Sequence, residues 1–429
     1  MYSQTRPYRE RLDELREILI RHGSLGLLLI DASELAQVEH DYGSKAFENV
    51  LSLVTAMVVE LQGNKEGVRT SDIVTISDRG GNAFLVFLSP KREDRESKTR
   101  VADLQAAARR VEEHLNGKLQ RLKSPYVRGH HRVTVGFSLV FFNPLVMPER
   151  LVARLAEEAW ECVRIQKMQL EFQNRCRLQE ILLTDQITSR FQPVVDIQRG
   201  GILGYEALSR GPAGTAHHAP IALFEVADQA DLVFELDRHC RRRALQSAKD
   251  LPENTKLFVN VLPSTLYDPD FQGQNLIALL EGLGLRPDRI VLEISERYAI
   301  ENYALYIESI ESLTSMGFSF AVDDVGAGYS GLERLTQIKP RYLKFDMQLV
   351  RNIDASDIRK EMARALKTFA DKMGSTIIAE GIEREAELRT CVDLGLDYGQ
   401  GYLLGRPSEG FIVPTLPELG ARIGEPSGA

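Results

Sequence analysis

The stretch Gly204-Tyr205-Glu206-Ala207-Leu208-Ser209-Arg210 decides the fold of the C-terminal half of this 429-residue chain. Glu-Ala-Leu on its own is also compatible with a helix. Here the apolar pair Ile202-Leu203 precedes the stretch and Gly211-Pro212 follows it, and these flanks are typical of a short strand that ends at a turn. The stretch therefore predicts a strand that carries a carboxylate, Glu206, close to its end.

Seven other short apolar runs occur in the same half of the chain and alternate with segments of helical pattern. About eight strands with helices between them, in roughly 250 residues, predict an α/β fold with a C-terminal (β/α)₈ barrel. Such barrels place their catalytic groups at the C-terminal ends of the strands. The expected strands are 191–195, 203–208, 257–261, 290–294, 318–322, 342–345, 376–379 and 399–402.

Polar side chains lie near the ends of most of these runs. They are Glu206, Asn260, Glu293, Asp323, Asp324, Lys344, Glu380 and Gln400. Charged groups at the end of a buried strand are costly unless they are paired or bind a ligand. Oxygen ligands without His or Cys suit a hard cation, Mg²⁺ or Mn²⁺, and the adjacent pair Asp323-Asp324 could let one carboxylate bridge two ions.

Two ions about 3.5–4 Å apart stabilise both the attacking and the leaving oxygen in phosphate ester hydrolysis. The pattern therefore predicts a metal-dependent phosphodiesterase with Glu380, Lys344 and Glu206 as catalytic residues. Glu380 would help to hold an ion and accept a proton, and Lys344 would orient water or stabilise developing charge. Arg210 follows Glu206 and can pair with a phosphate through two hydrogen bonds.

The same residues resemble the signature of the EAL domain family, whose members linearise cyclic di-GMP to pGpG. The resemblance covers residues 178 to about 412 and agrees in both order and spacing. The matching stretches are Phe191-Gln192-Pro193, Glu206-Ala207-Leu208 with Arg210, Val259-Asn260, Glu293-Ile-Ser-Glu296, Asp323-Asp324-Val-Gly326-Ala-Gly328-Tyr329-Ser330, Lys344-Phe-Asp346, Ala379-Glu380-Gly381-Ile-Glu383 and Gln400-Gly401-Tyr402.

The resemblance implies a role for each matched residue. The metal-binding set would be Glu206, Asn260, Glu293, Asp323, Asp324 and Glu380. The substrate contacts and the rest of the site would come from Gln192, Arg210, Asp346, Glu383 and Gln400. Glu296 would steady the loop after Asp324. Val325, Ala327 and Gly331 stand where the family usually has Phe, Thr (sometimes Ala) and Ser. We expect the smaller side chains at Val325 and Gly331 to affect rate and dimer coupling rather than ligand identity.

Residues 1–150 predict a separate domain of α+β or α/β palm type, which resembles a GGDEF domain. In that family, acidic groups after a Gly-Gly pair bind the metal ions that activate GTP. Asn82 and Ala83 follow Gly80-Gly81 here and supply no charge, while Asp31 matches the other metal carboxylate. The resemblance implies a degenerate, catalytically inactive domain with a structural or regulatory role, and with GTP or a regulatory protein as its partner.

The remaining boundaries follow from composition. Residues 151–177 are expected to form a helical linker, because neither Gly nor Pro occurs between Glu149 and Gln192, and 413–429 a flexible tail. A net charge of −8 argues against a dedicated nucleic-acid binder. Four scattered cysteines without a CxxC pair indicate reduced thiols in a cytoplasmic protein, and no apolar run is long enough for a membrane span.

Three functions remain open from the sequence. The first is a cyclic di-GMP phosphodiesterase that uses Mg²⁺ or Mn²⁺, with two ions expected. The second is a non-catalytic receptor that binds cyclic di-GMP and signals through the helix at 149–192, and the third is a scaffold with no nucleotide role. The complete set of metal-binding residues favours the first. A homodimer is expected from the resemblance alone.

Overall fold

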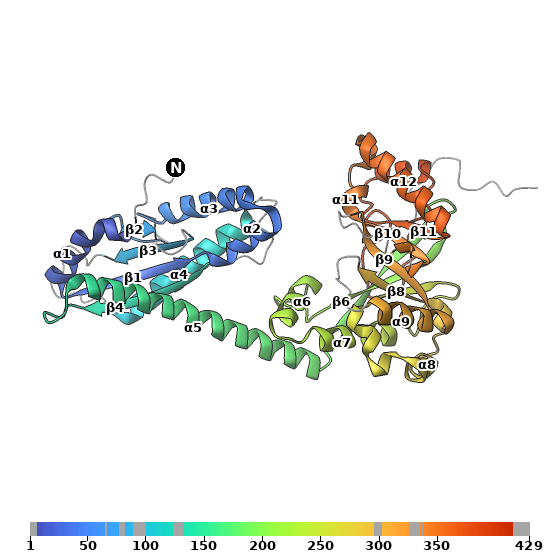
Figure 1. Cartoon of the computed structure of the whole chain (residues 1–429), viewed down its shortest axis with the longest axis horizontal. Helices are drawn as coiled ribbons and strands as arrows, with labels where there is room; N and C mark the ends of the chain where they lie inside the picture. The colour runs from blue at the N-terminus through green and yellow to red at the C-terminus, as the bar shows by residue number, and fades with distance from the viewer. Residues whose placement is uncertain are drawn as a thin grey trace, which may run out of the picture. The chain divides into compact units, whose positions relative to one another are not determined.

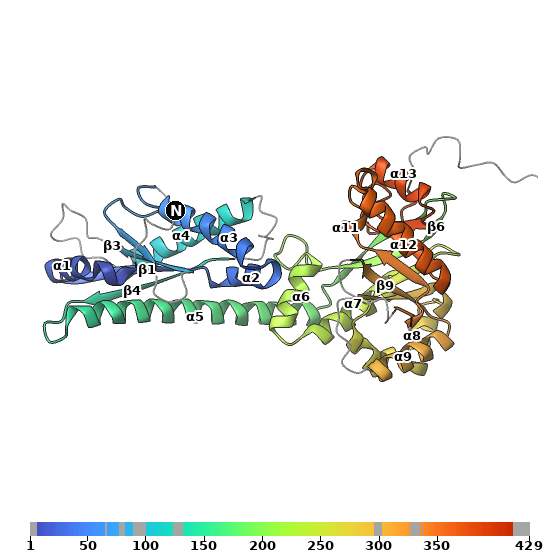
Figure 2. The same ribbon diagram turned by 45° about the horizontal axis from the view of Figure 1, so that its top comes forward.

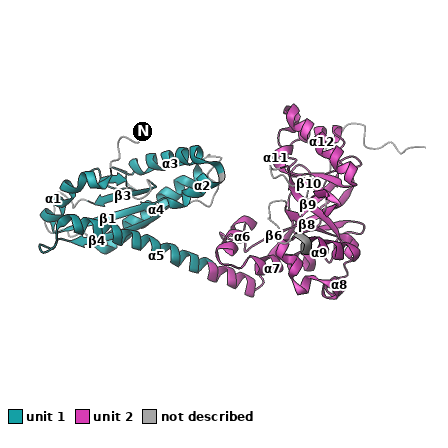
Figure 3. Ribbon diagram, in the orientation of Figure 1, with its two compact units in different colours: residues 1–174 teal, residues 175–429 magenta. Residues whose placement is uncertain are grey.

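The computed structural model describes residues 7–64, 67–76, 82–88, 100–122, 132–295, 303–326, 335–336 and 338–414. The chain divides into two compact units, Met1–Asn174 and Arg175–Ala429 (Figure 3). One helix, α5 (Pro148–Leu183), begins in the first unit and ends in the second. It stops short of Gln192 because that residue belongs to the first barrel strand, β5 (Thr188–Asp196).

Unit 1 is built on an antiparallel sheet in which the strands have the order β2-β3-β1-β4 (Figure 1). The strands are β1 (Ser24–Asp31), β2 (Ile73–Ile76), β3 (Ala83–Leu88) and β4 (Thr134–Phe141). The helices before α5 are α1 (Leu12–His22), α2 (Ala36–Tyr42), α3 (Ser44–Val59) and α4 (Val101–Arg121). The turn between β2 and β3, with Gly80 and Gly81, lies outside the described residues.

The central strand β1 is buried on both faces, which explains its unbroken apolar sequence. Because successive side chains of a strand point to opposite faces, Leu28 and Ile30 pack with residues of α3 and α4, whereas Leu27 and Leu29 pack with residues of α1 and α5. Figure 2 shows α5 running along the sheet beside β4. Two helical layers therefore enclose one sheet in unit 1.

Unit 2 contains a closed barrel with the strand order β10-β11-β12-β5-β6-β7-β8-β9. Each predicted strand overlaps an observed one, but the last, predicted at 399–402, shares only Gly399 with the two-residue strand β12. The strands after β5 are β6 (Ile202–Arg210), β7 (Lys256–Asn260), β8 (Ile290–Ser295), β9 (Ser319–Val325), β10 (Tyr342–Phe345), β11 (Thr376–Ala379) and β12 (Tyr398–Gly399). The helices are α6 (Pro220–Gln229), α7 (Val233–Ser247), α8 (Gly273–Gly282), α9 (Tyr303–Ser315), α11 (Met347–Val350), α12 (Asp357–Met373) and α13 (Glu385–Asp393).

The barrel differs from a regular (β/α)₈ barrel in the direction of one strand. β5 runs antiparallel to both of its neighbours, β6 and β12, whereas the other neighbouring pairs are parallel. The reason lies in the connection from β5 to β6, which spans only residues 197–201 and is too short for the crossover helix that parallel strands need. The first strand therefore forms a hairpin with the second.

None of the helices in the described ranges is long and apolar enough to cross a bilayer.

Candidate active site

The barrel interior changes from apolar to polar within two residues along each strand. An apolar layer is formed by Val194, Phe258, Val291, Ala321, Tyr342 and Ile378. Because side chains alternate between inside and outside, the residue two positions further along a strand also faces inward, one layer higher. These positions are Asn260, Glu293, Asp323, Lys344 and Glu380. β5 runs the other way, so its polar residue, Gln192, lies two positions before Val194, and it pairs in register with Glu206.

The ammonium of Lys344 is the centre of this polar layer. The side chain is 1% exposed, and its Nζ lies 2.7 Å from Glu380 Oε1, 3.1 Å from Glu293 Oε1, 3.3 Å from Glu206 Oε2 and 3.5 Å from Asp323 Oδ1. These carboxylates come from four different strands or strand ends. The structure therefore brings the predicted acidic residues together around one buried cation.

Glu206 is held on its other sides by amide donors. Gln400 Nε2 donates to Glu206 Oε2 at 2.6 Å, and Asn260 Nδ2 donates to Oε1 at 3.0 Å. Gln400 also donates to Gln192 Oε1 at 3.1 Å, and Gln192 in turn donates to the carbonyl of Gly405 at 3.0 Å. This chain of hydrogen bonds fixes the orientation of the Glu206 carboxylate.

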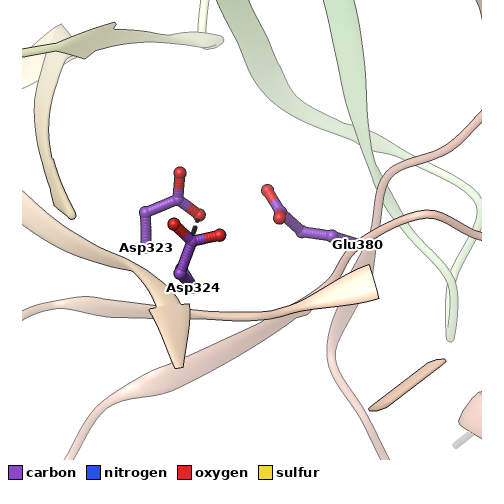
Figure 4. A group of neighbouring side chains, drawn as sticks. All are labelled: Asp323, Asp324 and Glu380. Carbon is purple, nitrogen blue, oxygen red and sulfur yellow. Dashed lines mark hydrogen bonds between the residues drawn. The ribbon is translucent and has the colours of Figure 1, made fainter. Parts of the chain in front are cut away.

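Asp323, Asp324 and Glu380 form a second, more accessible group (Figure 4). Each offers one carboxylate oxygen, and the three oxygens lie within 4.8 Å of one another. The backbone of Asp324 has a φ of 61°, in the left-handed region that residues other than Gly rarely adopt. Its backbone N–H donates to Asp323 Oδ1 at 3.0 Å, and Ser295 donates to its Oδ2 at 3.3 Å. The strained turn directs two adjacent carboxylates towards Glu380.

The electrostatic effects of this packing are large. Burial raises the pKa of Glu380 to about 8, and burial together with the charge of Glu206 raises the pKa of Glu293 well above its usual range. Burial also raises the pKa of Asp323. For Glu206 burial acts in the same direction, but Lys344 and the amide donors outweigh it and lower its pKa. The carboxylates likewise overcome the burial of Lys344 and hold its pKa well above the ordinary value.

One lysine does not balance the charge of these groups. Four carboxylates face Lys344, and Asp324 adds a fifth beside them. Both oxygens of Glu293 are buried without a hydrogen-bond partner among the described residues, since its contact with Lys344 does not have hydrogen-bond geometry. Buried anions in excess need further cations or protons. The arrangement is therefore suited to a hard cation with oxygen ligands.

The other predicted residues lie in different surroundings. Arg210 is half-buried at the end of β6, and its guanidinium donates to the carbonyl of Ser209 at 2.8 Å. Asp346 is buried and accepts from the backbone N–H of Gln348 at 2.6 Å, and its charge helps to raise the pKa of Asp324, after the larger effect of burial. Glu383 is exposed and lies 3.7 Å from Arg351, so the structure does not bring its carboxylate into the cluster. Glu296 lies outside the described residues, as do Ala327 and Gly331.

Two groups with a place in the site had no predicted role. Ser295 holds Asp324, although only Glu293 and Glu296 of that motif had an assigned role. Its position two residues after Glu293 was the available signal. The carbonyl of Gly405 accepts from Gln192, and no sequence pattern identifies a backbone acceptor. A cavity of about 310 Å³ opens beside Glu206 and Asn260 and is otherwise lined mainly by apolar groups such as Phe224.

In unit 1, Asp31 is satisfied by the chain's own groups. It is 2% exposed, and its Oδ2 lies 2.7 Å from the Nζ of Lys167 on α5. The hydroxyl and backbone N–H of Ser33 also donate to Asp31, at 2.9 and 3.0 Å. The carboxylate that matched a metal ligand in the sequence thus pairs with an ammonium group.

The sequence profile of the EAL domain matches residues 175–407, more than half of the chain. The chain belongs to the EAL domain family. One curated relative is the probable cyclic di-GMP phosphodiesterase PdeN of Escherichia coli, which is 30% identical over 52% of this chain and 44% of that protein. Another is the cyclic di-GMP phosphodiesterase RocR of Pseudomonas aeruginosa, which is 29% identical over 51% of this chain and 56% of that protein. The chain thus spans about half the length of these relatives.

Solved EAL structures show the same fold. The PaMucR phosphodiesterase in complex with c-di-GMP has a TM-score of 0.50 at 24% identity and covers 55% of this chain and 97% of that one. The Xanthomonas citri FimX EAL domain in complex with c-diGMP has a TM-score of 0.52 at 21% identity and covers 58% and 98%. The EAL assignment and the barrel predicted from the sequence are confirmed.

Proposed function

We propose that the barrel is a divalent-metal-dependent phosphodiesterase that hydrolyses cyclic di-GMP to pGpG. The observation that carries this proposal is the ring of four carboxylates around Lys344, with Asp324 and Glu380 at its accessible side. The names of the EAL relatives PdeN and RocR support the same substrate. The mainly apolar cavity beside Glu206 offers space for a planar base next to this polar layer.

The residues present fit a pair of Mg²⁺ or Mn²⁺ ions. Asp323, Asp324 and Glu380 would hold cations through the oxygens that face one another, and Glu206, Asn260 and Glu293 would complete the set from inside the barrel. The unpartnered oxygens of Glu293 are the observation that supports this fit most directly. When bound, such ions lower the pKa of water and stabilise the charge of a phosphate undergoing in-line attack.

The chain's own residues would position the reacting groups. Lys344 keeps the four carboxylates together at distances of 2.7–3.5 Å and can donate a hydrogen bond to a water or to a phosphate oxygen. Glu380 is 19% exposed, and its carboxylate, once ionised by a bound cation, would accept a proton from water at the mouth of the barrel. Arg210 has no carboxylate partner among the described residues and remains available for a phosphate.

A turnover assay tests this function. The full chain is incubated with cyclic di-GMP and Mg²⁺, Mn²⁺ or EDTA, and pGpG is separated by chromatography. We expect pGpG with at least one ion, none with EDTA, and none from Glu206→Ala, which loses a carboxylate held by three neighbours. Glu281→Gln is the matched control, because this exposed glutamate at the end of α8 is none of the predicted site residues. Tight binding of cyclic di-GMP without product from the wild type would instead identify a receptor.

We further propose that unit 1 is a degenerate GGDEF-like domain without cyclase activity, and that it acts as a structural or regulatory partner of the barrel. Asn82 and Ala83 supply no charge after the Gly pair, and Asp31 is paired with Lys167. Incubation with GTP and Mg²⁺ tests the first part, and we expect no cyclic di-GMP. Calorimetry with GTP tests whether the nucleotide binds to unit 1 as a regulatory ligand.

A further inference from the structure

The outer edge of strand β4 in unit 1 has a defined pattern of backbone groups. Phe142 N–H donates to the carbonyl of Gly23 at 2.9 Å, and β4 pairs with β1 on that side only. In an antiparallel pair the residues that bond to the neighbour alternate with residues that face away. The backbone N–H and C=O groups of the even-numbered residues of β4 therefore point towards β1. Those of the odd-numbered residues, from Val133 to Phe141, point towards the outer edge of the sheet.

The first part of this edge is closed by side chains of α4. Asn116 donates to the carbonyl of Val133 and accepts from its N–H, both at 2.9 Å, so that it imitates a neighbouring strand. Glu112 accepts from the N–H of Val135 at 2.9 Å. These two residues block strand pairing as far as Val135.

The second part of the edge is open. Among the described residues, no hydrogen-bond partner is present for the outward backbone groups of Phe137, Leu139 and Phe141. The Phe141 side chain is 68% exposed. No charged residue occurs between Val133 and Met147. Natural edge strands are usually protected by charged side chains, by Pro or by a helix or loop that covers them. Residues 137–141 contain neither a charged residue nor Pro.

The open segment is complementary to itself. Its sequence is Phe137-Ser-Leu139-Val-Phe141, which has an aromatic residue at each end and a leucine at the centre. We propose that a second copy of this chain pairs with this edge, antiparallel and with a two-fold axis at Leu139. Leu139 then faces Leu139 of the second copy, and each Phe137 faces a Phe141. All of these are outward residues, so each pair can exchange both backbone hydrogen bonds.

The absence of charge favours this occupant, and the small contact area sets the strength of the pairing. The paired segments and the loop that follows carry no charge, so no like charges meet across the axis. The aromatic pairs add stabilisation through cross-strand contact. A contact of five residues per copy buries less than the roughly 1,200 Å² of a stable interface, so the pairing is weak and concentration-dependent on its own. This inference does not depend on the phosphodiesterase proposal, because it concerns unit 1 alone.

Cross-linking tests the register. In a full-length background with Cys162→Ser and Cys176→Ser, Leu139→Cys is exposed to a mild oxidant. The predicted pairing brings the two Cα atoms to about 5.5 Å, within the range of a disulfide. The control is Leu53→Cys, which is 41% exposed on α3 of the same unit. We expect a covalent dimer from Leu139→Cys at least about tenfold faster than from Leu53→Cys, and equal rates would overturn the proposal.

Charge variants test the two-fold axis independently. Leu139→Lys and Leu139→Glu each place like charges opposite one another, so each alone should lose the association step seen by sedimentation velocity with the wild type. Mixing the two variants should restore it. Phe141→Lys, at a more exposed position, repeats the test if a variant at Leu139 fails to fold, as judged by Trp160 fluorescence. Association that survives all three variants, or an edge that captures only an unrelated extended peptide, would refute pairing between copies.

Discussion

The carboxylate cluster predicts an inverted dependence of barrel stability on pH when metal is removed. Glu380 has a pKa of about 8 in the folded state, against 4.5 for the ordinary glutamate of an unfolded chain. Between these values the folded state keeps a proton that the unfolded state releases. Stability is therefore lost as the pH rises from about 4.5 to about 8. A group with a lowered pKa would give the opposite slope.

The size of the effect follows from the same shift. Each unit of pKa difference is worth about 1.4 kcal/mol, so the interval from 4.5 to about 8 corresponds to about 5 kcal/mol of lost stability in EDTA. Burial of Glu380 beside Asp323 and Glu206 is the cause. A divalent cation takes the place of the proton, so Mn²⁺ should restore most of this stability at pH 8 by binding the folded state.

Urea unfolding of the full chain measures this effect. The chain contains one tryptophan, Trp160, which packs in unit 1, so its fluorescence reports that unit. Far-UV circular dichroism reports the unfolding of both units. An unfolding transition seen by circular dichroism but not by Trp160 fluorescence therefore belongs to the barrel. In EDTA, the barrel midpoint should fall from pH 5.5 to pH 8 and rise again with Mn²⁺. Glu380→Gln should flatten the slope, and Glu383→Gln should leave it unchanged.

A barrel that becomes more stable from pH 5.5 to pH 8 in EDTA would refute this reasoning. So would a slope in Glu380→Gln that equals the wild-type slope, because the pH dependence would then come from groups other than Glu380.

Two further predictions concern other parts of the molecule. Lys167→Met leaves the buried Asp31 carboxylate without its ammonium partner and should destabilise unit 1 by about 3 kcal/mol; the midpoint of the Trp160 fluorescence transition measures it, and an unchanged midpoint would show that the pair contributes nothing. Burial raises the pKa of Cys240 to about 12, so this thiol stays protonated at pH 8 and should react with a thiol reagent only after denaturation, whereas the exposed Cys176 reacts in the native protein; mass spectrometry of the labelled chain distinguishes the two sites, and native labelling of Cys240 would contradict the burial.

Hydrophobic pattern was sufficient to place the barrel strands but not to orient all of them. Each strand is a short apolar run between turn residues, and the closing of the barrel follows from their number and alternation with helices. The direction of β5 depends on the length of one connection, residues 197–201. That connection is visible in the sequence and already excludes a crossover helix.

The convergence of the site residues was predictable because period-two alternation sends them to one layer of the barrel. The central place of Lys344 was not, since a single Lys after an apolar run carries no information on its partners. For Glu383 the sequence was misleading in the opposite way. Its place in the motif suggests a position in the carboxylate cluster, whereas in the structure its side chain is exposed beside Arg351. The pairing of Asp31 with Lys167 joins residues that are 136 positions apart, and no local pattern predicts it.

Binding of Mn²⁺ tests the central claim most directly. Calorimetric titration of the metal-free full chain at pH 8 should show uptake of Mn²⁺, with protons released as the carboxylates ionise, and a double substitution of Asp323→Asn and Asp324→Asn should abolish it. Absence of Mn²⁺ uptake by the wild type, or uptake that the double substitution leaves unchanged, would contradict a cation site at this cluster.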